Sequence, residues 1–198
     1  MPDPARHAEL RFPVQYVIRP MTHEHADHRS YAGTVASGVM RPGDEVVVLP
    51  SGKVSRITTI DGPSGPVDEA FPPMAVSVSL ADDIDISRGD MLARPNNQPI
   101  ASTEFDATVC WMADDAALEP GREYVVKHTT RTTRARVVGL DYRLDVNTLH
   151  RDKSATALKL NELGRITLRT QVPLLLDEYV RNSSTGSFIL IDPDTNVT

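Results

Sequence analysis

Strict alternation of apolar and polar residues is the feature that most constrains how this chain can fold. From Phe12 to Ile18 every second residue is apolar, with Val14 and Tyr16 between the two ends. Successive side chains of a β-strand point to opposite faces, so this period predicts strands with one buried face. The same alternation, or a run of β-branched residues, marks segments at 45–49, 54–60, 74–80, 105–111, 124–126 and 188–191. The sequence therefore predicts many short strands.

Turn residues separate these segments. Fifteen prolines and eleven glycines punctuate the 198 residues, as at Arg41–Asp44, Pro50–Lys53 and Arg88–Asp90. Proline presets φ for the start of a turn, and glycine allows the positive φ that several turn types need. Short strands with frequent tight turns are typical of an all-β fold of barrels or sandwiches. The Arg-Gly-Asp tripeptide at 88–90 is interpreted as such a turn.

Segment 155–163 is the most ambiguous. Leu160 and Leu163 have helical spacing, but Leu158 and Leu160 flank Lys159 in the alternation of a strand. A further β run follows at 165–171, and we therefore expect a strand that ends in a turn at 161–164.

A polar, proline-containing stretch at 94–99 divides the chain into two halves of domain size. We expect an N-terminal tail at 1–8, one β domain at 9–95, a linker at 96–99 and a second β domain at 100–198. Two domains of about 100 residues each suit the chain length better than one large sheet with a polar gap.

Composition limits the classes of partner and the compartment. The net charge of −6 and the pI near 5.5 argue against general affinity for nucleic acid or anionic membranes. Cys110 is the one cysteine, which excludes an intramolecular disulfide and favours a reducing, cytoplasmic setting. No apolar run approaches the roughly 18–20 residues of a membrane span.

Motifs of nucleotide and hydrolytic chemistry are absent from the sequence. There is no GxxxxGK[ST] loop, since Gly52-Lys53 is followed by Val54, and there is no Asn-Lys-x-Asp motif. Neither GxSxG nor HExxH occurs. We therefore expect no catalytic residue and no cofactor-binding residue in this chain.

The densest group of metal-ligating residue types lies at His23, His25 and His28, beside Glu24 and Asp27. Imidazole and carboxylate groups bind zinc or nickel. Because the group lies between two expected strands, a solvated loop is the preferred interpretation. The three histidines remain weak metal candidates, and no metal site is expected.

Five basic residues cluster between 127 and 143, after the expected strand at 124–126, with Asp141 as the one acid in that range. We call this set the basic ribbon: Lys127, Arg131, Arg134, Arg136 and Arg143. It is either an exposed hairpin face that pairs with acids of the same chain or a docking surface for an acidic partner, RNA or phosphate. Aromatic residues for stacking on single-stranded nucleic acid are scarce, at 5% of the chain.

Long segments are similar to a known family. The segments 11–20, 31–38 and 41–52, and later 160–165 and 185–192, resemble the second and third domains of the sulfate adenylyltransferase large subunit, the CysN/NodQ family. The amino-acid sequence of these segments most resembles the actinobacterial form of the family, in which the polypeptide continues into an adenylylsulfate kinase. The resemblance runs from Arg11 to Thr198.

The resemblance implies an architecture like that of elongation factor Tu, in which a GTPase domain precedes two β-barrels. It implies that 9–95 is a domain II-like barrel and that 100–198 is a domain III-like barrel with a truncated final strand. The family's motifs for GTP and Mg²⁺ would precede Arg11, and its final strand would continue past Thr198. The resemblance therefore implies that the chain is a fragment at both ends. In the family, the large subunit pairs with a small catalytic subunit of the CysD type. GTP hydrolysis drives that subunit's conversion of ATP and sulfate to adenylylsulfate and pyrophosphate.

We accordingly expect a non-catalytic scaffold that docks the small subunit and contacts its own GTPase domain. The alternative is an RNA-binding module of a translation-factor GTPase, and a metalloenzyme using the three histidines is a third class. If the basic ribbon docks the small subunit, charge reversal at Arg131 and Arg134 should weaken binding.

Overall fold

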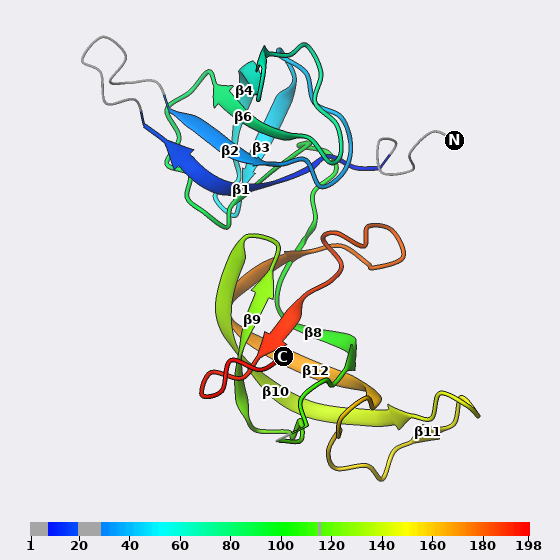
Figure 1. Cartoon of the computed structure of the whole chain (residues 1–198). Helices are drawn as coiled ribbons and strands as arrows, with labels where there is room; N and C mark the ends of the chain where they lie inside the picture. The colour runs from blue at the N-terminus through cyan, green and yellow to red at the C-terminus, as the bar shows by residue number, and fades with distance from the viewer. Residues whose placement is uncertain (1–7, 20–28, 115) are drawn as a thin grey trace. The chain divides into compact units, whose positions relative to one another are not determined.

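The structure is a computed structural model that describes residues 8–19, 29–114 and 116–198 (Figure 1). The regular elements of these residues are strands. The described residues form no helix, and so no helix long and apolar enough to cross a membrane. Two compact units are formed, the first by the described residues up to Ala101 with Thr129–Arg131 and Leu175–Ser187. The second contains Ser102–His128, Thr132–Leu174 and Phe188–Thr198. The predicted all-β fold is confirmed, while the domain bounds drawn from the sequence stay a prediction.

The first unit contains a sheet that closes on itself. Its order is β3-β7-β1-β2-β6-β4-β5, and an additional β3–β4 pairing joins the two sides into a barrel. The neighbouring strands are antiparallel. The elements are β1 (Arg11–Ile18), β2 (Ser30–Thr34), β3 (Glu45–Leu49), β4 (Lys53–Gly62), β5 (Gly65–Pro66), β6 (Ala75–Leu80) and β7 (Met91–Ala93).

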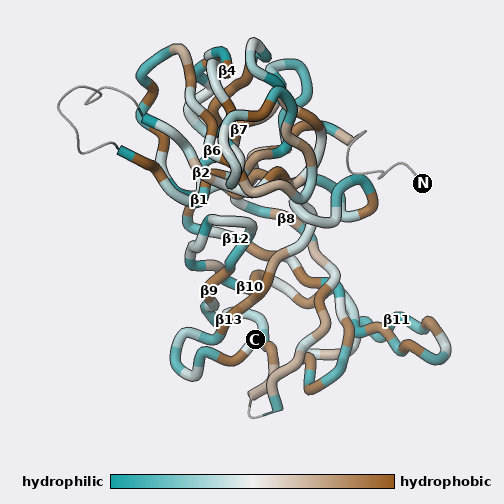
Figure 2. The backbone as a smooth tube through the Cα atoms, turned by 45° about the horizontal axis from the view of Figure 1, so that its top comes forward, coloured by the Kyte–Doolittle hydropathy of each residue, from teal (hydrophilic) through white to brown (hydrophobic). Residues whose placement is uncertain are grey.

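Inward-facing residues of these strands fill the first barrel, and hydrophobic segments alternate with polar ones along the backbone (Figure 2). Val76 and Val78 of β6 are buried, as the alternation at 74–80 predicts. The buried Tyr31 satisfies its hydroxyl by donating to the carbonyl of Ile84 at 2.9 Å. The remaining core includes Phe12, Val14, Met40, Val46, Val48, Ile57, Ile60 and Leu92.

Strand β1 departs from the alternation predicted for it. Phe12 and Val14 are fully buried, but Tyr16 is 68% exposed and Ile18 is 39% exposed. Val17 packs against the core instead. The pairing of β1 with β2 shifts register between Val14 and Tyr16. A bulge of this kind inserts one extra residue, so every following side chain changes face.

Segment 175–187 packs within the first unit through a buried arginine. Arg11 is 1% exposed. Its Nε and Nη2 donate to the two carboxylate oxygens of Asp177, each at 2.8 Å. Its Nη1 donates to the backbone carbonyls of Leu10 and Asn97, also at 2.8 Å. The guanidinium is therefore paired and hydrogen-bonded, as a buried charge must be.

The second unit is built on a sheet of order β13-β9-β10-β12-β8, with β11 paired to β10. Strands β10 and β12 are long and antiparallel, with register shifts near Gly139 and Tyr142. The elements are β8 (Ile100–Cys110), β9 (Glu123–His128), β10 (Arg131–Leu144), β11 (Arg151–Asp152), β12 (Leu163–Leu176) and β13 (Ile189–Ile191).

Aromatic residues anchor the core of the second unit. Trp111 is 2% exposed, and its ring meets that of Tyr124 edge to face at 5.5 Å between centroids. The indole N–H donates to the carbonyl of Ala116 at 2.7 Å. Phe105 and Phe188 form a second edge-to-face pair at 5.7 Å. The alternation predicted at 105–111 is confirmed, since Ala107 and Trp111 are buried.

The strand predicted before the turn at 161–164 is wrong except for one bridge, and the turn itself lies slightly earlier, at Leu160 and Asn161. Leu158 is fully buried and pairs with Leu118, but the chain then turns, and Leu160 is 46% exposed. The backbone N–H of Glu162 donates to the carbonyl of Lys159, and the Glu162 carboxylate accepts from the Lys159 N–H at 2.8 Å. This turn satisfies locally the backbone groups that a strand would have paired across a sheet.

Candidate interaction surface

The outward faces of β9 and β10 position three members of the basic ribbon in the second unit. Ala135 and Val137 point into the core, so Arg134 and Arg136 between and beside them face solvent, as Lys127 of β9 does. Arg136 pairs with Glu123 at 2.8 Å, with both side chains more than half exposed. In the described part of the chain, no carboxylate forms an ion pair with Lys127 or Arg134.

Arg131 belongs to the first unit, where its side chain already has hydrogen-bond and ion-pair partners. Its Nε donates to the carbonyl of Gly89 at 3.0 Å, and its Nη2 pairs with Asp90 at 2.9 Å. Its side chain is 19% exposed. The Arg88–Asp90 tripeptide is a turn, because the N–H of Asp90 donates to the carbonyl of Ser87 at 3.1 Å.

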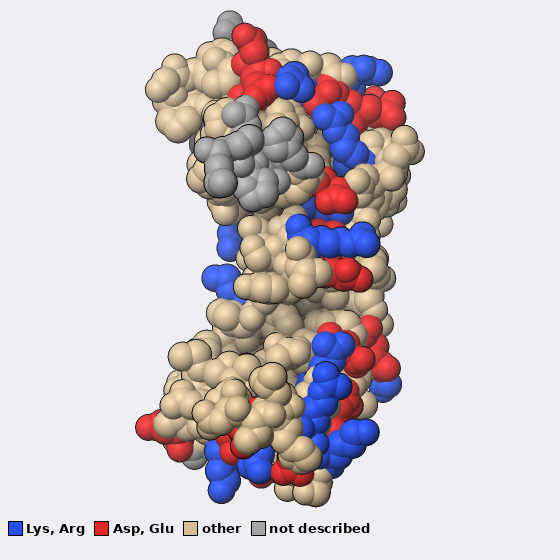
Figure 3. Space-filling model, turned by 90° about the vertical axis from the view of Figure 1, so that its right-hand side faces the viewer, with Lys and Arg blue, Asp and Glu red and all other residues tan. Residues whose placement is uncertain are grey.

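Arg143 lies near the far end of β10, away from the β9–β10 turn in sequence. It pairs with Asp152 of β11 at 3.0 Å and with Glu162 at 2.9 Å. On the face drawn in Figure 3, basic side chains are interspersed with acidic ones. Of the five ribbon residues, Lys127 and Arg134 are therefore the cations whose charge is least compensated by described neighbours.

The histidine group at His23, His25 and His28 lies outside the described residues. Within 8–19, 29–114 and 116–198, no group of three His, Cys, Asp or Glu side chains is arranged to hold a metal ion. Cys110 is exposed at the end of β8.

The Gly52-Lys53 pair does not fit the phosphates of GTP. The N–H of Gly52 donates to the carbonyl of Val48 at 2.8 Å, and Lys53 opens β4 opposite Val48. The pair thus forms a tight turn between two antiparallel strands. A phosphate-binding loop instead leads into a helix, whose N-terminal N–H groups contact the phosphates.

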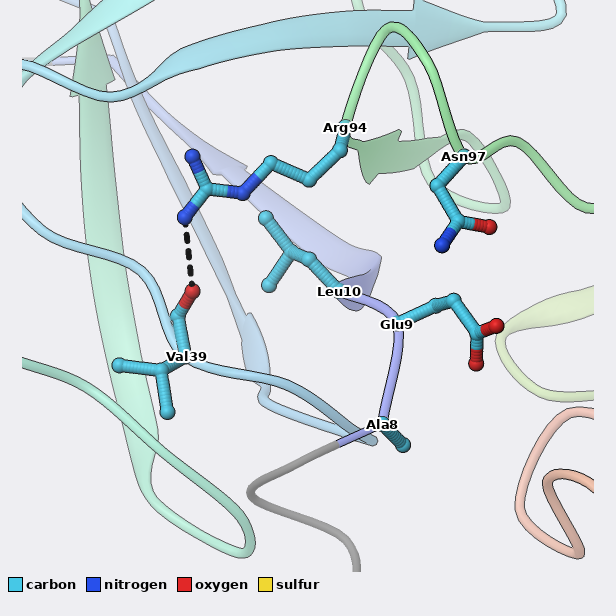
Figure 4. Close-up of a pocket in the computed structure, with 6 residues that line it drawn as sticks. All are labelled: Ala8, Glu9, Leu10, Val39, Arg94 and Asn97. Carbon is cyan, nitrogen blue, oxygen red and sulfur yellow. Dashed lines mark hydrogen bonds between the residues drawn. The ribbon is translucent and has the colours of Figure 1, made fainter.

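A hollow of about 320 Å³ lies beside the start of β1 in the first unit. Figure 4 shows Arg94 reaching across it to the carbonyl of Val39, with which it makes a hydrogen bond of 3.2 Å. The same guanidinium pairs with Asp44 at 2.8 Å. The remaining lining residues are Ala8, Glu9, Leu10 and Asn97. These two partners, both from the same unit, account for the position of the Arg94 side chain in the hollow.

Comparisons with known proteins give closely related sequences. Residues 104–198 match the family model described as GTP-eEF1A C-terminal domain-like. A Bifunctional enzyme CysN/CysC of Mycobacterium tuberculosis is 83% identical over 96% of this chain and 31% of its own length. A Sulfate adenylyltransferase subunit 1 of Bacteroides fragilis is 45% identical over 96% of this chain and 39% of its own length. The chain thus spans between three and four tenths of the length of these two relatives.

Solved structures support the fold. A structure of sup35 complexed with GDP matches with a TM-score of 0.84 and 19% identity, covering 98% of this chain and 46% of the other. A bacterial selenocysteine-specific elongation factor, EF-Sec, matches with a TM-score of 0.69 and 18% identity, over 98% of this chain and 27% of the other. Likeness at such low identity concerns the fold, and it confirms the predicted translation-factor-like barrels.

Proposed function

Because the chain belongs to the CysN family of sulfate adenylyltransferase large subunits, we propose that it is a non-catalytic scaffold that docks a partner subunit. The observation that carries this proposal is the 83% identity over 96% of the chain to a CysN/CysC protein. Identity at this level extends to exposed positions, where packing alone does not dictate the residue.

In the complete subunit, the scaffold would link a GTPase domain to the small catalytic subunit of the CysD type. GTP and Mg²⁺ would be bound by that GTPase domain, since Gly52-Lys53 lies in a turn that cannot cradle phosphate. The small subunit would make adenylylsulfate and pyrophosphate from ATP and sulfate. We place the complex in the cytoplasm, which suits a chain with one exposed cysteine.

The docking contact proposed for the small subunit uses Lys127 and Arg134. Both are exposed on adjacent strands, and neither has a carboxylate partner among the described residues. Uncompensated charges at an exposed surface attract an acidic partner and accelerate its association. Arg136 and Arg143 retain less free charge, because each already pairs with acids of this chain.

The test is charge reversal at Lys127 and Arg134 in the full-length large subunit. We expect Lys127→Glu combined with Arg134→Glu to weaken small-subunit binding roughly tenfold by calorimetry at low salt, since each exposed ion pair contributes up to about 1 kcal/mol. The difference should shrink as salt is raised. Arg131 is left intact, because its reversal would also break the Asp90 pair.

The matched control is Lys53→Glu combined with Lys159→Glu, which makes the same change in net charge at two other exposed lysines. Equal weakening by both double variants would assign the effect to net charge and contradict the proposed surface. A filter-binding titration with tRNA tests the RNA-binding alternative. Micromolar binding that is lost in the Lys127 and Arg134 variant would favour that alternative.

A further inference from the structure

On the outer face of the first barrel, β3 and β7 present four apolar side chains, which we call the outer strip. These residues alternate with residues of the barrel core and therefore point away from it. The two strands pair so that Val47 lies opposite Ala93 and Leu49 lies opposite Met91. All four are at most 7% exposed, so another part of the chain covers them.

Leu175 covers the outer strip. It is 3% exposed and packs in one hydrophobic cluster with the four residues of the strip. Leu175 lies near the end of β12, but it groups with the first unit, whereas the same strand up to Leu174 groups with the second. The first unit keeps the chain from this point to Ser187. We call residues 175–187 the strap.

A cation stands beside the outer strip, and an acid of the strap meets it. Arg11 of β1 lies opposite Ala93, so the two side chains share one face of the sheet. Asp177 follows Leu175 by two residues, the spacing at which the side chains of a strand share a face. Its two carboxylate oxygens accept from the Arg11 guanidinium, each at 2.8 Å. The strap therefore places an apolar group on the apolar strip and a carboxylate on the cation.

Polar side chains hold the rest of the strap. Asn182 is 8% exposed, and its Nδ2 donates to the Ser37 hydroxyl at 2.7 Å. Thr185 is fully buried, and its hydroxyl donates to the Asp177 carboxylate at 2.6 Å. The Asn182 side-chain oxygen accepts from the Thr185 N–H at 3.3 Å. The strap is thus a compact loop whose buried polar side chains are paired.

We propose that the strap is a resident ligand of the first barrel, which binds it through the outer strip, Arg11 and Ser37. The first barrel then depends on a segment that the second half of the sequence supplies. Without the strap, the barrel would expose four apolar side chains and leave the Arg11 guanidinium without its carboxylate. The inference goes beyond the proposed function and does not depend on the docking of a partner subunit.

The first test is amide hydrogen exchange in the full chain with Leu175→Ala. Removing this side chain leaves a cavity over the outer strip, and exchange in β3 and β7 should accelerate about tenfold or more. The matched control is Leu168→Ala, the same change at a fully buried leucine of β12 in the second unit. It should leave exchange in β3 and β7 within about threefold of the wild type. No acceleration with Leu175→Ala, or equal acceleration by both variants, would overturn the inference.

The second test asks whether the strap binds as a separable ligand. A fluorescent peptide of residues 173–188 is titrated into the full chain carrying Leu175→Ala and Asp177→Asn, and binding is followed by anisotropy. The peptide should bind this variant at least about tenfold more tightly than the wild type, whose own strap occupies the surface at high effective concentration. A peptide with the same two substitutions should bind neither chain.

Equal binding of the intact peptide to both chains, or binding to neither, would contradict a strap-binding surface on the first barrel. Asn182→Ala is a milder change that removes the hydrogen bond to the Ser37 hydroxyl. It replaces the double variant if far-ultraviolet dichroism shows that the double variant does not fold, and the same two outcomes then decide.

Discussion

At the scale of single residues, Arg11 shows how a charge can become part of a core. Three of its guanidinium nitrogens make four hydrogen bonds, two of them to the Asp177 carboxylate. Full pairing offsets the large cost of removing a cation from water. Removing the arginine would take the bidentate cation away from the Asp177 carboxylate and a donor away from the carbonyls of Leu10 and Asn97.

We therefore expect Arg11→Ala to lower the free energy of unfolding by about 3–5 kcal/mol. Arg11→Lys should recover only part of this, because an ammonium group cannot reproduce the bidentate geometry. The measurement is a urea titration, with Arg88→Ala as an exposed control expected to change stability by about 0.5 kcal/mol or less. Similar urea midpoints for the two alanine variants would show that the Arg11–Asp177 pair contributes nothing to stability.

The burial of single residues was predictable along regular strands but not where the backbone departs from regularity. Val76 and Val78 are buried as predicted, but Tyr16 and Ile18 are exposed because a bulge reverses the faces of β1. Nothing in the alternation of hydrophobic residues encodes the extra residue. Likewise, the basic ribbon was visible as a cluster, but which arginines are already paired depends on acids distant in sequence, such as Asp90 for Arg131.

At the scale of elements, the contact between β1 and β2 depends on one glycine. Gly33 of β2 lies opposite Val14, and a Cβ there would come within 2.5 Å of the Pro13 carbonyl and 2.9 Å of the Phe12 ring. The two strands can approach this closely only if position 33 has no side chain. The close approach occurs beside the bulge, where β1 bends.

Gly33→Ala should destabilise the first barrel by about 1–3 kcal/mol, the usual cost of adding atoms to a packed site. The matched variant is Gly139→Ala in β10, where a Cβ would meet no atom within 4 Å. We expect that change to alter stability by less than about 1 kcal/mol, in either direction. Thermal unfolding followed by circular dichroism compares the two, and equal midpoints would contradict the packing argument.

Strands and turns at this scale were largely predictable, whereas the loop at 145–150, between β10 and β11, was not. The turn at Arg41–Asp44 and the strand at Glu45–Leu49 follow from proline, glycine and β-branched residues. Residues 145–150 carry no motif and no alternation that predicts a strand. Their signal is an Asp-x-Asn turn that contains two aliphatic residues, and only the structure places Leu149 at a positive φ.

At the scale of the whole molecule, the stability of the second unit should depend on pH. Hydrogen bonds hold the pKa of three of its carboxyls below the usual value: backbone N–H groups at Asp145, the Ser154 hydroxyl and N–H at Asp152, and the N–H groups of Asp194 and Thr195 at Asp192. The pKa of each of these carboxyls is lower in the folded state than its unfolded value of 3.8. The ionised carboxyl therefore stabilises the fold, and this stabilisation is fully present at pH values above 3.8. This stability is lost as pH falls through the folded pKa.

The urea midpoint should therefore drop between about pH 5 and pH 3. Asp192→Asn should lower the midpoint at pH 5, because Arg122 loses its charged partner, and should flatten the dependence on pH. The two titrations are run at fixed ionic strength. A slope for Asp192→Asn as steep as that of the wild type would mean that Asp192 does not contribute to the acid sensitivity.

The position of Trp111 gives the molecule an optical label that needs no engineering. It is the one tryptophan of the chain, it is buried in the second unit, and its indole is hydrogen-bonded to Ala116. Its fluorescence therefore follows the melting of that unit, while far-ultraviolet dichroism follows the strands of both. Superimposed fluorescence and dichroism curves would identify one cooperative transition, and separated curves would give each unit its own folding free energy from a single unmodified sample.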